Sequence, residues 1–420
     1  MRRCGICGQI RWCVILVECH APAAGFANIN HGVTIDMTGI STITTSKSDY
    51  TVASVGAGSS WVDVYAALEP FNRTVAGGRN GAVGVGGLTL GGGISYFSPQ
   101  VGFTCDTVVG FEVVLADGRV VQASANSPFD DLFKALKGGM NNFGIVTQID
   151  FFTIPLPKEG ILGGSVVYDI KYAADVFRAF ATISGAPQYD IHASIVIGAI
   201  FNSTARSWTL SSTPIYTLPE IQPAAYEELF AIPNITSSVT LVKLSTFSNE
   251  SVTPPLNWLF YTATFGVSAE LLDDIFSIAN ESLYNFDVPG GVLWDLAFEP
   301  FPTAFLSHSN GQDVLGTSPA DSNGIILLVS ALWPELADDD AVHTKAVEMM
   351  TKVRARAVRM GMLKRFVYGN YADWSQLPIE SYGKENVEFL RKVSAKYDPD
   401  GVFQKKVTGG FKLPATRRIK

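Results

Sequence analysis

Short apolar runs rich in β-branched residues and separated by glycine turns make up the first 157 residues of the chain. Their apolar and polar positions predict strands over residues 32–37, 50–55 and 108–115. Asp117-Gly118 follows the third run and precedes Val120-Val121, so a β-hairpin with a glycine turn is expected there.

Two helical segments interrupt these strands. One begins near Ser60, where Ser60 and Asp63 have the spacing of a capping box and an apolar face follows. The other covers residues 130–137 and ends at Gly138-Gly139, where glycine can adopt the left-handed conformation of a helix cap.

The pattern changes after residue 157. Strand-like runs at 194–201 and 325–332 alternate with helical stretches such as 224–229, without the short regular spacing of βαβ units. This predicts an antiparallel sheet backed by helices. The last part holds a strand-like run at 366–371 and a helix near 384–396.

These changes predict an α+β protein with a split first domain. We expect residues 1–157 to form one domain, residues 158–362 to form a second, and residues 363–414 to return to the first. At 420 residues and 47% hydrophobic content, the chain can bury two cores.

Charge excludes one class of partner and hydropathy argues against another. Only 17% of residues are charged, the formal net charge is −8, and basic residues form no cluster, so nucleic acid is not an expected partner. No apolar run approaches the roughly 18 residues that suggest a membrane span.

Four of the five cysteines lie in the first nineteen residues, which raises two alternatives. A zinc site calls for a second CxxC pair, and only one is present. A signal peptide needs an uninterrupted apolar stretch, whereas Gln9 and Arg11 interrupt this one. The four are Cys4, Cys7, Cys13 and Cys19; Cys105 stands apart and is expected to be a packed thiol.

His31, His192, His308 and His343 have no metal-ligand spacing, so no metal site is expected from them. Glycosylation sequons favour an exported protein. Five N-x-[ST] sequons in an acidic chain predict a secreted glycoprotein. They lie at Asn72, Asn202, Asn234, Asn249 and Asn280.

The glycine-rich segment 77–93 is the densest chemical signal. Glycine allows close approach of the backbone to a ligand, and successive amides in such turns form anion-binding nests. A diphosphate-bearing cofactor suits this segment better than a flexible linker, because valine and leucine are interleaved through it. A nicotinamide-type loop is disfavoured, since the pattern that starts at Gly84 fails at Thr89. A second segment, 138–147, is either a helix cap or part of the same site.

Together these segments resemble the berberine-bridge-enzyme-like family of FAD-linked oxidoreductases, which has a PCMH-type FAD-binding domain of the vanillyl-alcohol-oxidase fold. The similarity covers nearly the whole chain and is weakest in the middle. The matching stretches are 24–29 with 32–36, 55–58 with Trp61, 83–93, 116–119, 141–146, 368–371, 382–383 and 397–403.

The resemblance implies bound FAD. The predicted cofactor contacts are Val83, Gly84, Gly86, Gly87, Gly91, Gly92, Gly93, Asn142, Gly144, Ile145, Val146 and Asn370. Some relatives carry a second, cysteinyl flavin link at the position of Asn80, so no such link is expected here. Val83 matches the small, oxygen-permissive residue of related oxidases, which implies molecular oxygen as the second substrate.

His20 matches the family's covalent flavin attachment, with an unassigned loop histidine as the alternative. The loop before it departs from the family: Glu18 places a negative charge where backbone meets the cofactor diphosphate. The first βαβ unit is also absent, so we interpret residues 1–19 as an atypical or truncated start.

The resemblance assigns catalysis to Tyr371, with Tyr368 and Asn370 as helpers. The family tyrosine removes a hydroxyl proton while hydride passes to the flavin, and a phenol with a pKa near 10 needs a neighbour to stabilise its anion. The implied function is FAD-dependent oxidation of an alcohol, sugar or secondary-metabolite small molecule. The alternatives are an inactive, flavin-free remnant and a carbohydrate-binding protein without turnover.

Overall fold

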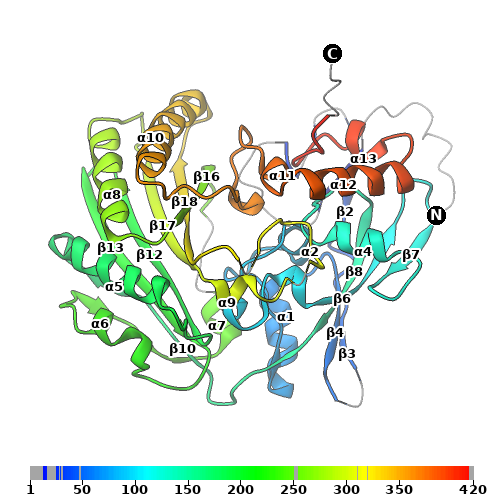
Figure 1. Cartoon of the computed structure of the whole chain (residues 1–420), viewed down its shortest axis with the longest axis horizontal. Helices are drawn as coiled ribbons and strands as arrows, with labels where there is room; N and C mark the ends of the chain where they lie inside the picture. The colour runs from blue at the N-terminus through cyan, green and yellow to red at the C-terminus, as the bar shows by residue number, and fades with distance from the viewer. Residues whose placement is uncertain are drawn as a thin grey trace.

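Two β-sheets lie side by side in the computed structural model, with helices on the outside and short connecting helices between them (Figure 1). The structure describes residues 13–16, 25–27, 29, 32–46, 49–249, 254–309, 311–318 and 320–415. The cysteine and signal-peptide alternatives and the expected role of His20 fall mainly outside these residues.

The larger sheet has nine strands, and every pairing in it is antiparallel. The main order is β14-β11-β13-β12-β17-β18-β16, with β10 and β15 beside it. The strands are β10 (Ile161–Gly163), β11 (Val166–Tyr168), β12 (Ala193–Asn202), β13 (Ser207–Tyr216), β14 (Thr236–Ser237), β15 (Thr240–Val242), β16 (Asn257–Gly266), β17 (Leu293–Phe301) and β18 (Gly324–Trp333).

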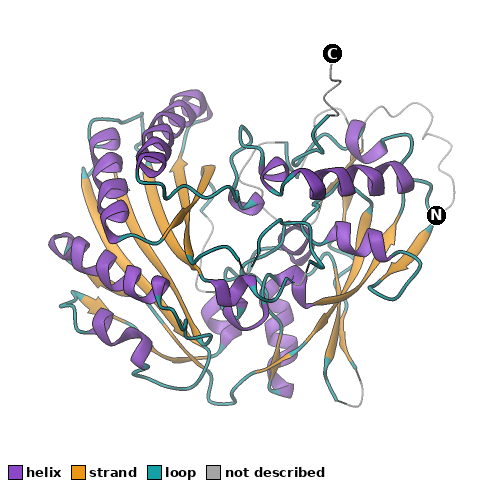
Figure 2. Cartoon of the chain, viewed as in Figure 1, coloured by secondary structure: helices purple, strands orange, loops and turns teal. Residues whose placement is uncertain are grey.

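Helices cover only one face of this sheet (Figure 2). Alternate strand residues such as Trp294, Leu296 and Phe298 share a buried core with these amphipathic helices, because side chains alternate across a strand. The opposite face is turned toward the second sheet. The helical elements of this half are η3 (Ile170–Tyr172), α5 (Ala173–Gly185), η4 (Ala224–Tyr226), α6 (Glu227–Phe230), α8 (Ala269–Leu283), η5 (Leu336–Asp338) and α10 (Asp339–Arg359). Helices α7 (Leu244–Ser248) and α9 (Thr303–Leu306) pack instead into the core of the other half.

The second sheet has five antiparallel strands in the order β3-β4-β8-β6-β7. Helix α1 packs on it through Trp61, whose ring centroid lies 5.8 Å from that of Phe151 on β8. The elements here are β1 (Cys13–Leu16), β2 (Val33–Asp36), β3 (Ile43–Thr45), β4 (Val52–Gly56), α1 (Trp61–Leu68), η1 (Glu69–Phe71), β5 (Arg73–Thr74), α2 (Val85–Leu90), α3 (Ser98–Val101), η2 (Thr104–Thr107), β6 (Val108–Val114), β7 (Val120–Ala123), α4 (Asp130–Leu136), β8 (Ile145–Phe152) and β9 (Ile154–Pro155).

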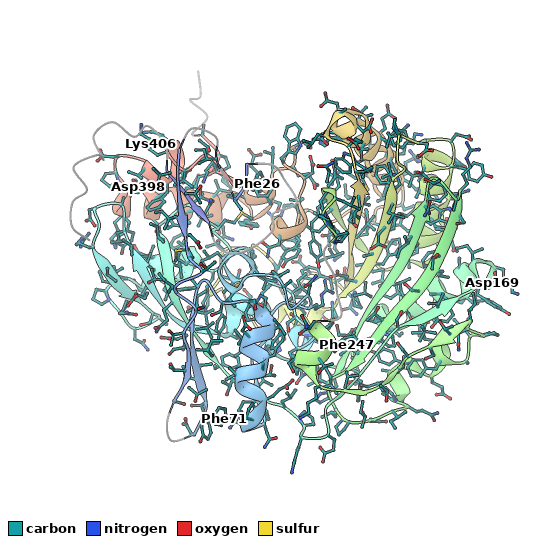
Figure 3. All side chains as sticks on the ribbon, turned by 180° about the vertical axis from the view of Figure 1, so that it is seen from behind. Phe26, Phe71, Asp169, Phe247, Asp398 and Lys406 are labelled. Atoms are coloured by element: carbon teal, nitrogen blue, oxygen red, sulfur yellow. The ribbon has the colours of Figure 1, made fainter. Side chains whose placement is uncertain are left out.

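The C-terminal segment returns to the five-stranded half (Figure 1). Lys396 and Tyr397 both bond to the Asp131 carboxylate of α4, and the Phe26 ring meets the Phe411 ring edge-on at 5.1 Å. Figure 3 shows Phe26, Asp398 and Lys406 in the upper part of the same half of the molecule. The elements are η6 (Gly369–Tyr371), α11 (Pro378–Ser381), α12 (Lys384–Tyr397) and α13 (Val402–Lys405).

One predicted strand is wrong. Residues 366–371 form no ladder and end in the single turn η6, although the run reads as a strand. The backbone N–H of Val367 bonds to Ser381 Oγ instead of to a neighbouring strand, and the aromatic rings of Phe366 and Tyr368 pack around Phe103. Side-chain packing, rather than strand pairing, fixes this segment.

The expected α+β fold, its antiparallel helix-backed sheet and the hairpin at Gly118 are confirmed. Cys105 is buried, as expected of a packed thiol.

Among the sequon asparagines, Asn72, Asn234 and Asn249 are exposed, while Asn280 accepts a hydrogen bond from Trp208. Secretion stays a prediction. No described helix has the length and apolar character needed to cross a membrane.

Candidate active site

Tyr371 meets two charged side chains from distant parts of the chain. Its hydroxyl donates to Glu299 Oε1 at 3.0 Å and accepts from Arg79, which also donates to Glu299 Oε1 at 2.5 Å. Arg79 precedes α2, Glu299 lies on β17 and Tyr371 closes η6. The arginine and glutamate side chains are only 16% and 4% exposed. The three residues therefore form a largely dry network between the two sheets.

The electrostatics of this network favour a protonated phenol. Burial raises the pKa of Tyr371 well above its usual value, an effect that the charge of Arg79 opposes and that of Glu299 reinforces. A proton leaving the phenol has an acceptor in the Glu299 carboxylate. The second oxygen of Glu299, Oε2, is buried without a hydrogen-bond partner among the described residues. The arrangement can thus pass a proton from the phenol to the carboxylate.

Tyr368 packs against Tyr371, and Asn370 bonds to Tyr368. The rings of Tyr368 and Tyr371 meet edge to face, with centroids 4.7 Å apart. The Asn370 amide donates to Leu88 O and to the Tyr368 hydroxyl, both at 3.0 Å. Tyr368 is fully buried, so its position suits a supporting residue better than one that contacts substrate. Asn370 connects the C-terminal segment to α2.

Gly91 makes room for Asn370, and this gives a prediction. A Cβ at position 91 would lie 1.9 Å from Asn370 Oδ1. Gly91→Ala should displace that amide, break its bonds to Leu88 and Tyr368, and lower the free energy of unfolding by about 1–3 kcal/mol. Urea unfolding measures this. Gly39→Ala is the control, because a Cβ there meets nothing within 4 Å; equal losses in the two variants contradict the prediction.

Most of the glycine-rich segment is packed within the chain, and Gly87 is its exposed glycine, in the first turn of α2. The amides of Gly91 and Gly92 bond to Gly87 O and Thr89 O, so they are not free to hold an anion, and Leu315 packs over Gly92. Gly93 lies against Leu88 and Thr104. The predicted cofactor contacts of Gly91, Gly92 and Gly93 stay predictions, and they cannot use the amides of Gly91 and Gly92. The amide of Val83 bonds to Asn80 O, Gly84 precedes α2, and Gly86 and Gly87 form its first turn, where Gly87 is exposed.

The second glycine-containing segment is built into the fold. The Asn142 amide donates to Gly139 O and Phe411 O and accepts from Gln404, so its hydrogen-bonding capacity is used within the chain. Gly144 lies where a Cβ would come within 2.4 Å of Val113. Ile145 and Val146 begin β8 and pair with Val114 and Val113 of β6. Their contacts with a cofactor stay predictions.

The face of the larger sheet that carries no helices completes the site. Asp295, Ala297 and Glu299 of β17 point to this face, because the residues between them point to the helices. Phe260 of β16 shares the face, and its ring meets the Tyr371 ring edge-on at 6.1 Å.

Arg79, Asp295 and Glu299 were not among the residues expected from sequence. A signal was present: two acids four residues apart, on one face of an otherwise apolar strand, are costly to bury unless they have a function. Arg79 likewise stands alone as a charge within the glycine-rich segment.

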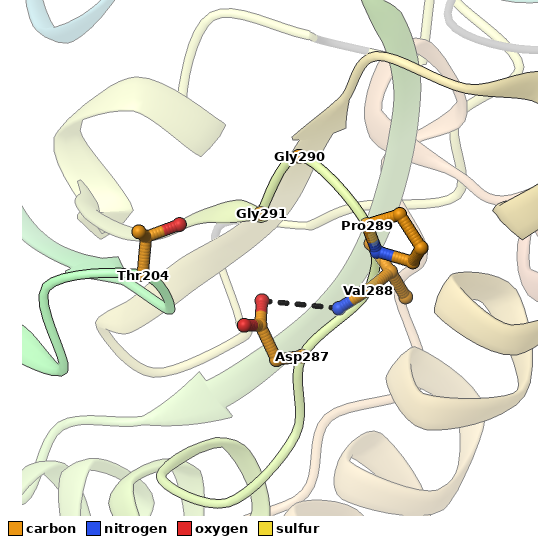
Figure 4. A pocket seen from close by; sticks show the side chains of 6 residues that line it. All are labelled: Thr204, Asp287, Val288, Pro289, Gly290 and Gly291. Atoms are coloured by element: carbon orange, nitrogen blue, oxygen red, sulfur yellow. Dashed lines mark hydrogen bonds between the residues drawn. The ribbon is translucent and has the colours of Figure 1, made fainter.

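A hollow of about 510 Å³ lies elsewhere, lined by Thr204 and residues 287–291 (Figure 4). The Asp287 carboxylate there bonds to its neighbours Ser203 and Val288. Leu293, two residues after Gly291, and Glu299 lie six residues apart on β17, roughly 20 Å at 3.3 Å per residue. The hollow is therefore separate from the Tyr371 network. Among the described residues no group of three His, Cys, Asp or Glu side chains could hold a metal ion.

Comparison with known proteins supports the resemblance found in the sequence. A family model described as "FAD binding domain" matches residues 14–124. The FAD-dependent monooxygenase drtC of Aspergillus calidoustus is 35% identical over 404 residues, covering 94% of this chain and 76% of the relative. The FAD-dependent monooxygenase sdcF of Emericella nidulans is 36% identical, covering 94% and 83%.

Solved structures confirm the fold. The 6-hydroxy-D-nicotine oxidase from Arthrobacter nicotinovorans gives a TM-score of 0.77 at 19% identity, covering 96% of this chain and 86% of that one. Berberine bridge enzyme from Eschscholzia californica gives 0.74 at 15% identity, covering 98% and 87%. Relatives above 30% identity over nearly the whole chain show the family: the protein belongs to the berberine-bridge-enzyme-like FAD-linked oxidoreductases.

Proposed function

We propose that this protein oxidises an alcohol, sugar or secondary-metabolite C–H group, with hydride transfer to FAD and reoxidation by molecular oxygen. The observation that carries the proposal is the buried network of Tyr371, Glu299 and Arg79 between the two sheets. A proton acceptor held out of water, beside the family's FAD-binding domain, suits removal of a proton together with a hydride.

The described residues fit a flavin dinucleotide. The Ser59 hydroxyl is buried without a partner among the described residues, and Ser59 O accepts from Val85 N at the start of α2. Gly87, in the first turn of α2, is exposed and has no side chain, so a polar ligand can approach its backbone closely. Bound FAD supplies the two-electron acceptor. We include a covalent link through His20 in the proposal.

The chain's own residues handle the proton. Tyr371 accepts the substrate hydroxyl proton as its own proton passes to Glu299 Oε1, so the net base is the carboxylate. Arg79 orients both partners and balances the negative charge of Glu299. Tyr368 and Asn370 hold the Tyr371 ring in place. A buried phenol alone is a poor base, because its pKa is raised.

The fate of oxygen separates two reactions. An oxidase releases hydrogen peroxide, whereas the relatives' name, monooxygenase, implies that an oxygen atom enters the product. We propose the oxidase reaction, since Val83 is a small, half-buried residue just before α2. Labelled dioxygen distinguishes the two: label in peroxide supports the proposal, and label in the organic product refutes it.

Flavin absorbance tests the function directly. Purified full-length protein should be yellow, and its flavin bands should bleach when secondary alcohols, aldoses or phenolic alcohols are added without oxygen. Colour that stays with acid-precipitated protein supports the covalent link. A colourless protein favours the inactive remnant, and sugar binding without bleaching favours a carbohydrate-binding protein.

A further inference from the structure

Asp295 lies in the middle of a row of side chains that crosses the larger sheet. Strand pairing places it opposite Ile200 of β12 on one side and Ser330 of β18 on the other, and Ser330 is opposite Phe260 of β16. The row Ile200, Asp295, Ser330 and Phe260 therefore shares the face that meets Tyr371, because paired residues point to the same side of a sheet. Phe260 contacts the Tyr371 ring directly.

This face is only partly covered and carries both apolar and polar side chains, among them the half-buried Ser211 opposite Gly198. Val196, Ile200, Phe260 and Leu328 are half-buried, whereas the alternate residues of the same strands are buried against the helices. Asp295, also half-buried, is the one carboxyl in its row. Phe260 and Asp295 are two strands apart, roughly 10 Å at 4.8 Å per strand, which is the length of two or three fused rings.

Asp295 has an unused hydrogen-bonding atom. Its Oδ1 is buried and has no partner among the described residues, and Gly198 leaves space beside it: a Cβ there would lie 3.6 Å from that oxygen. A buried polar atom without a hydrogen-bond partner lowers stability, unless a ligand supplies that partner. Glu299 lies four residues along the same strand and face, about 13 Å away between Cα atoms.

The protonation of Asp295 follows from this setting. Burial, and to a lesser extent the negative charge of Glu299, raise the pKa of Asp295 to about 7. Its partners in the row are uncharged, and Arg79 is paired with Glu299 rather than with Asp295. Below this pKa the carboxyl is neutral and carries an O–H donor.

We propose that Asp295 is a substrate-binding residue that donates a hydrogen bond to an oxygen acceptor, such as a ketone carbonyl, on an apolar ring compound lying between it and Tyr371. The inference rests on the proposed function, and it narrows the substrate to apolar ring systems that carry an acceptor oxygen.

Binding of a matched pair of probes tests this. The FAD-loaded full chain is titrated with 1-tetralone and with tetralin, which lacks the carbonyl, and flavin difference spectra give the two dissociation constants. At about pH 6 the preference for the ketone, expressed as the ratio of the constants, should fall about tenfold in Asp295→Leu, which removes the donor. Asp295→Asn keeps an amide donor and should hold most of the preference.

The pH dependence gives a second readout. In the unmodified chain the preference should decline as the pH rises through about 7, since ionisation removes the donor, whereas Asp295→Asn should show no such decline. Asp273→Asn is the control, because Asp273 lies on α8, behind the opposite face. An unchanged ratio in Asp295→Leu, or a preference that is constant with pH in the unmodified chain, overturns the inference.

Ligand binding can be measured without turnover, so the Asp295 assignment and the proposed oxidation can each be refuted independently. A chain that shows the predicted ketone preference but reduces no flavin retains the Asp295 assignment and refutes the oxidation. A chain that oxidises alcohols but shows no Asp295-dependent preference supports the oxidation and refutes the Asp295 assignment.

Discussion

Arg79→Met should lower the free energy of unfolding by about 3–5 kcal/mol, because it leaves the Glu299 carboxylate buried without its counter-charge. The side chains of the pair are 16% and 4% exposed, so water replaces little of the lost interaction. Chemical denaturation of the variant and of the unmodified chain measures the loss.

Two comparisons make this result specific. Arg119→Met removes an ion pair whose side chains are 62% and 51% exposed, so it should cost at most about 1 kcal/mol. The double variant Arg79→Met with Glu299→Gln removes both charges and should recover part of the loss. If Arg79→Met is no more destabilising than Arg119→Met, the Arg79–Glu299 pair is not shielded from water.

Local pattern was sufficient for much of the fold. The runs at 194–201 and 325–332 are strands β12 and β18, each extended by one residue at both ends. The segment 384–396 is helix α12 with one further residue. These elements have one apolar face and one partner layer, so their periodicity alone indicates their structure. The run at 366–371 fails because its aromatic residues contact several segments at once, which alternation does not reveal.

The site was harder to predict, since its parts are far apart in sequence. Tyr371 came from the family resemblance, but its partners Arg79 and Glu299 lie 292 and 72 residues away. No local spacing connects them. Cofactor binding by the glycine run stays a prediction, and pattern could not show that the space at Gly91 is taken by Asn370. Sequence indicates which residues are unusual, and the fold shows what each one touches.

The same network explains why a tyrosine would be used in a dry site. Glu299 alone, buried beside a substrate, would need to reach the hydroxyl directly. Tyr371 extends its reach, because the phenol oxygen accepts one proton while giving up another to Glu299 Oε1, 3.0 Å away. Glu299 becomes neutral as it takes up the proton, and the phenol stays protonated before and after the step. Tyr371 is thus predicted to matter for rate more than for substrate affinity.

Tyr371→Phe should reduce the rate of flavin reduction by about 10²- to 10⁴-fold, the usual contribution of a positioned acid–base group. The ring and its edge-on contacts with Tyr368 and Phe260 remain, so FAD content and substrate affinity should change little. Anaerobic rapid mixing of the FAD-loaded protein with an alcohol substrate measures the rate. Its dependence on substrate concentration separates binding from chemistry.

Tyr216→Phe is the matched control, since it also removes a phenol that bonds to a carboxylate, Asp190, at 2.9 Å. That pair lies outside the network, so flavin reduction should stay within about threefold of the unmodified rate. Glu299→Gln should resemble Tyr371→Phe, because a neutral amide does not accept the relayed proton. A Tyr371→Phe protein that still reduces flavin at nearly the full rate while Glu299→Gln does not would make the carboxylate the direct base, with Tyr371 only positioning it.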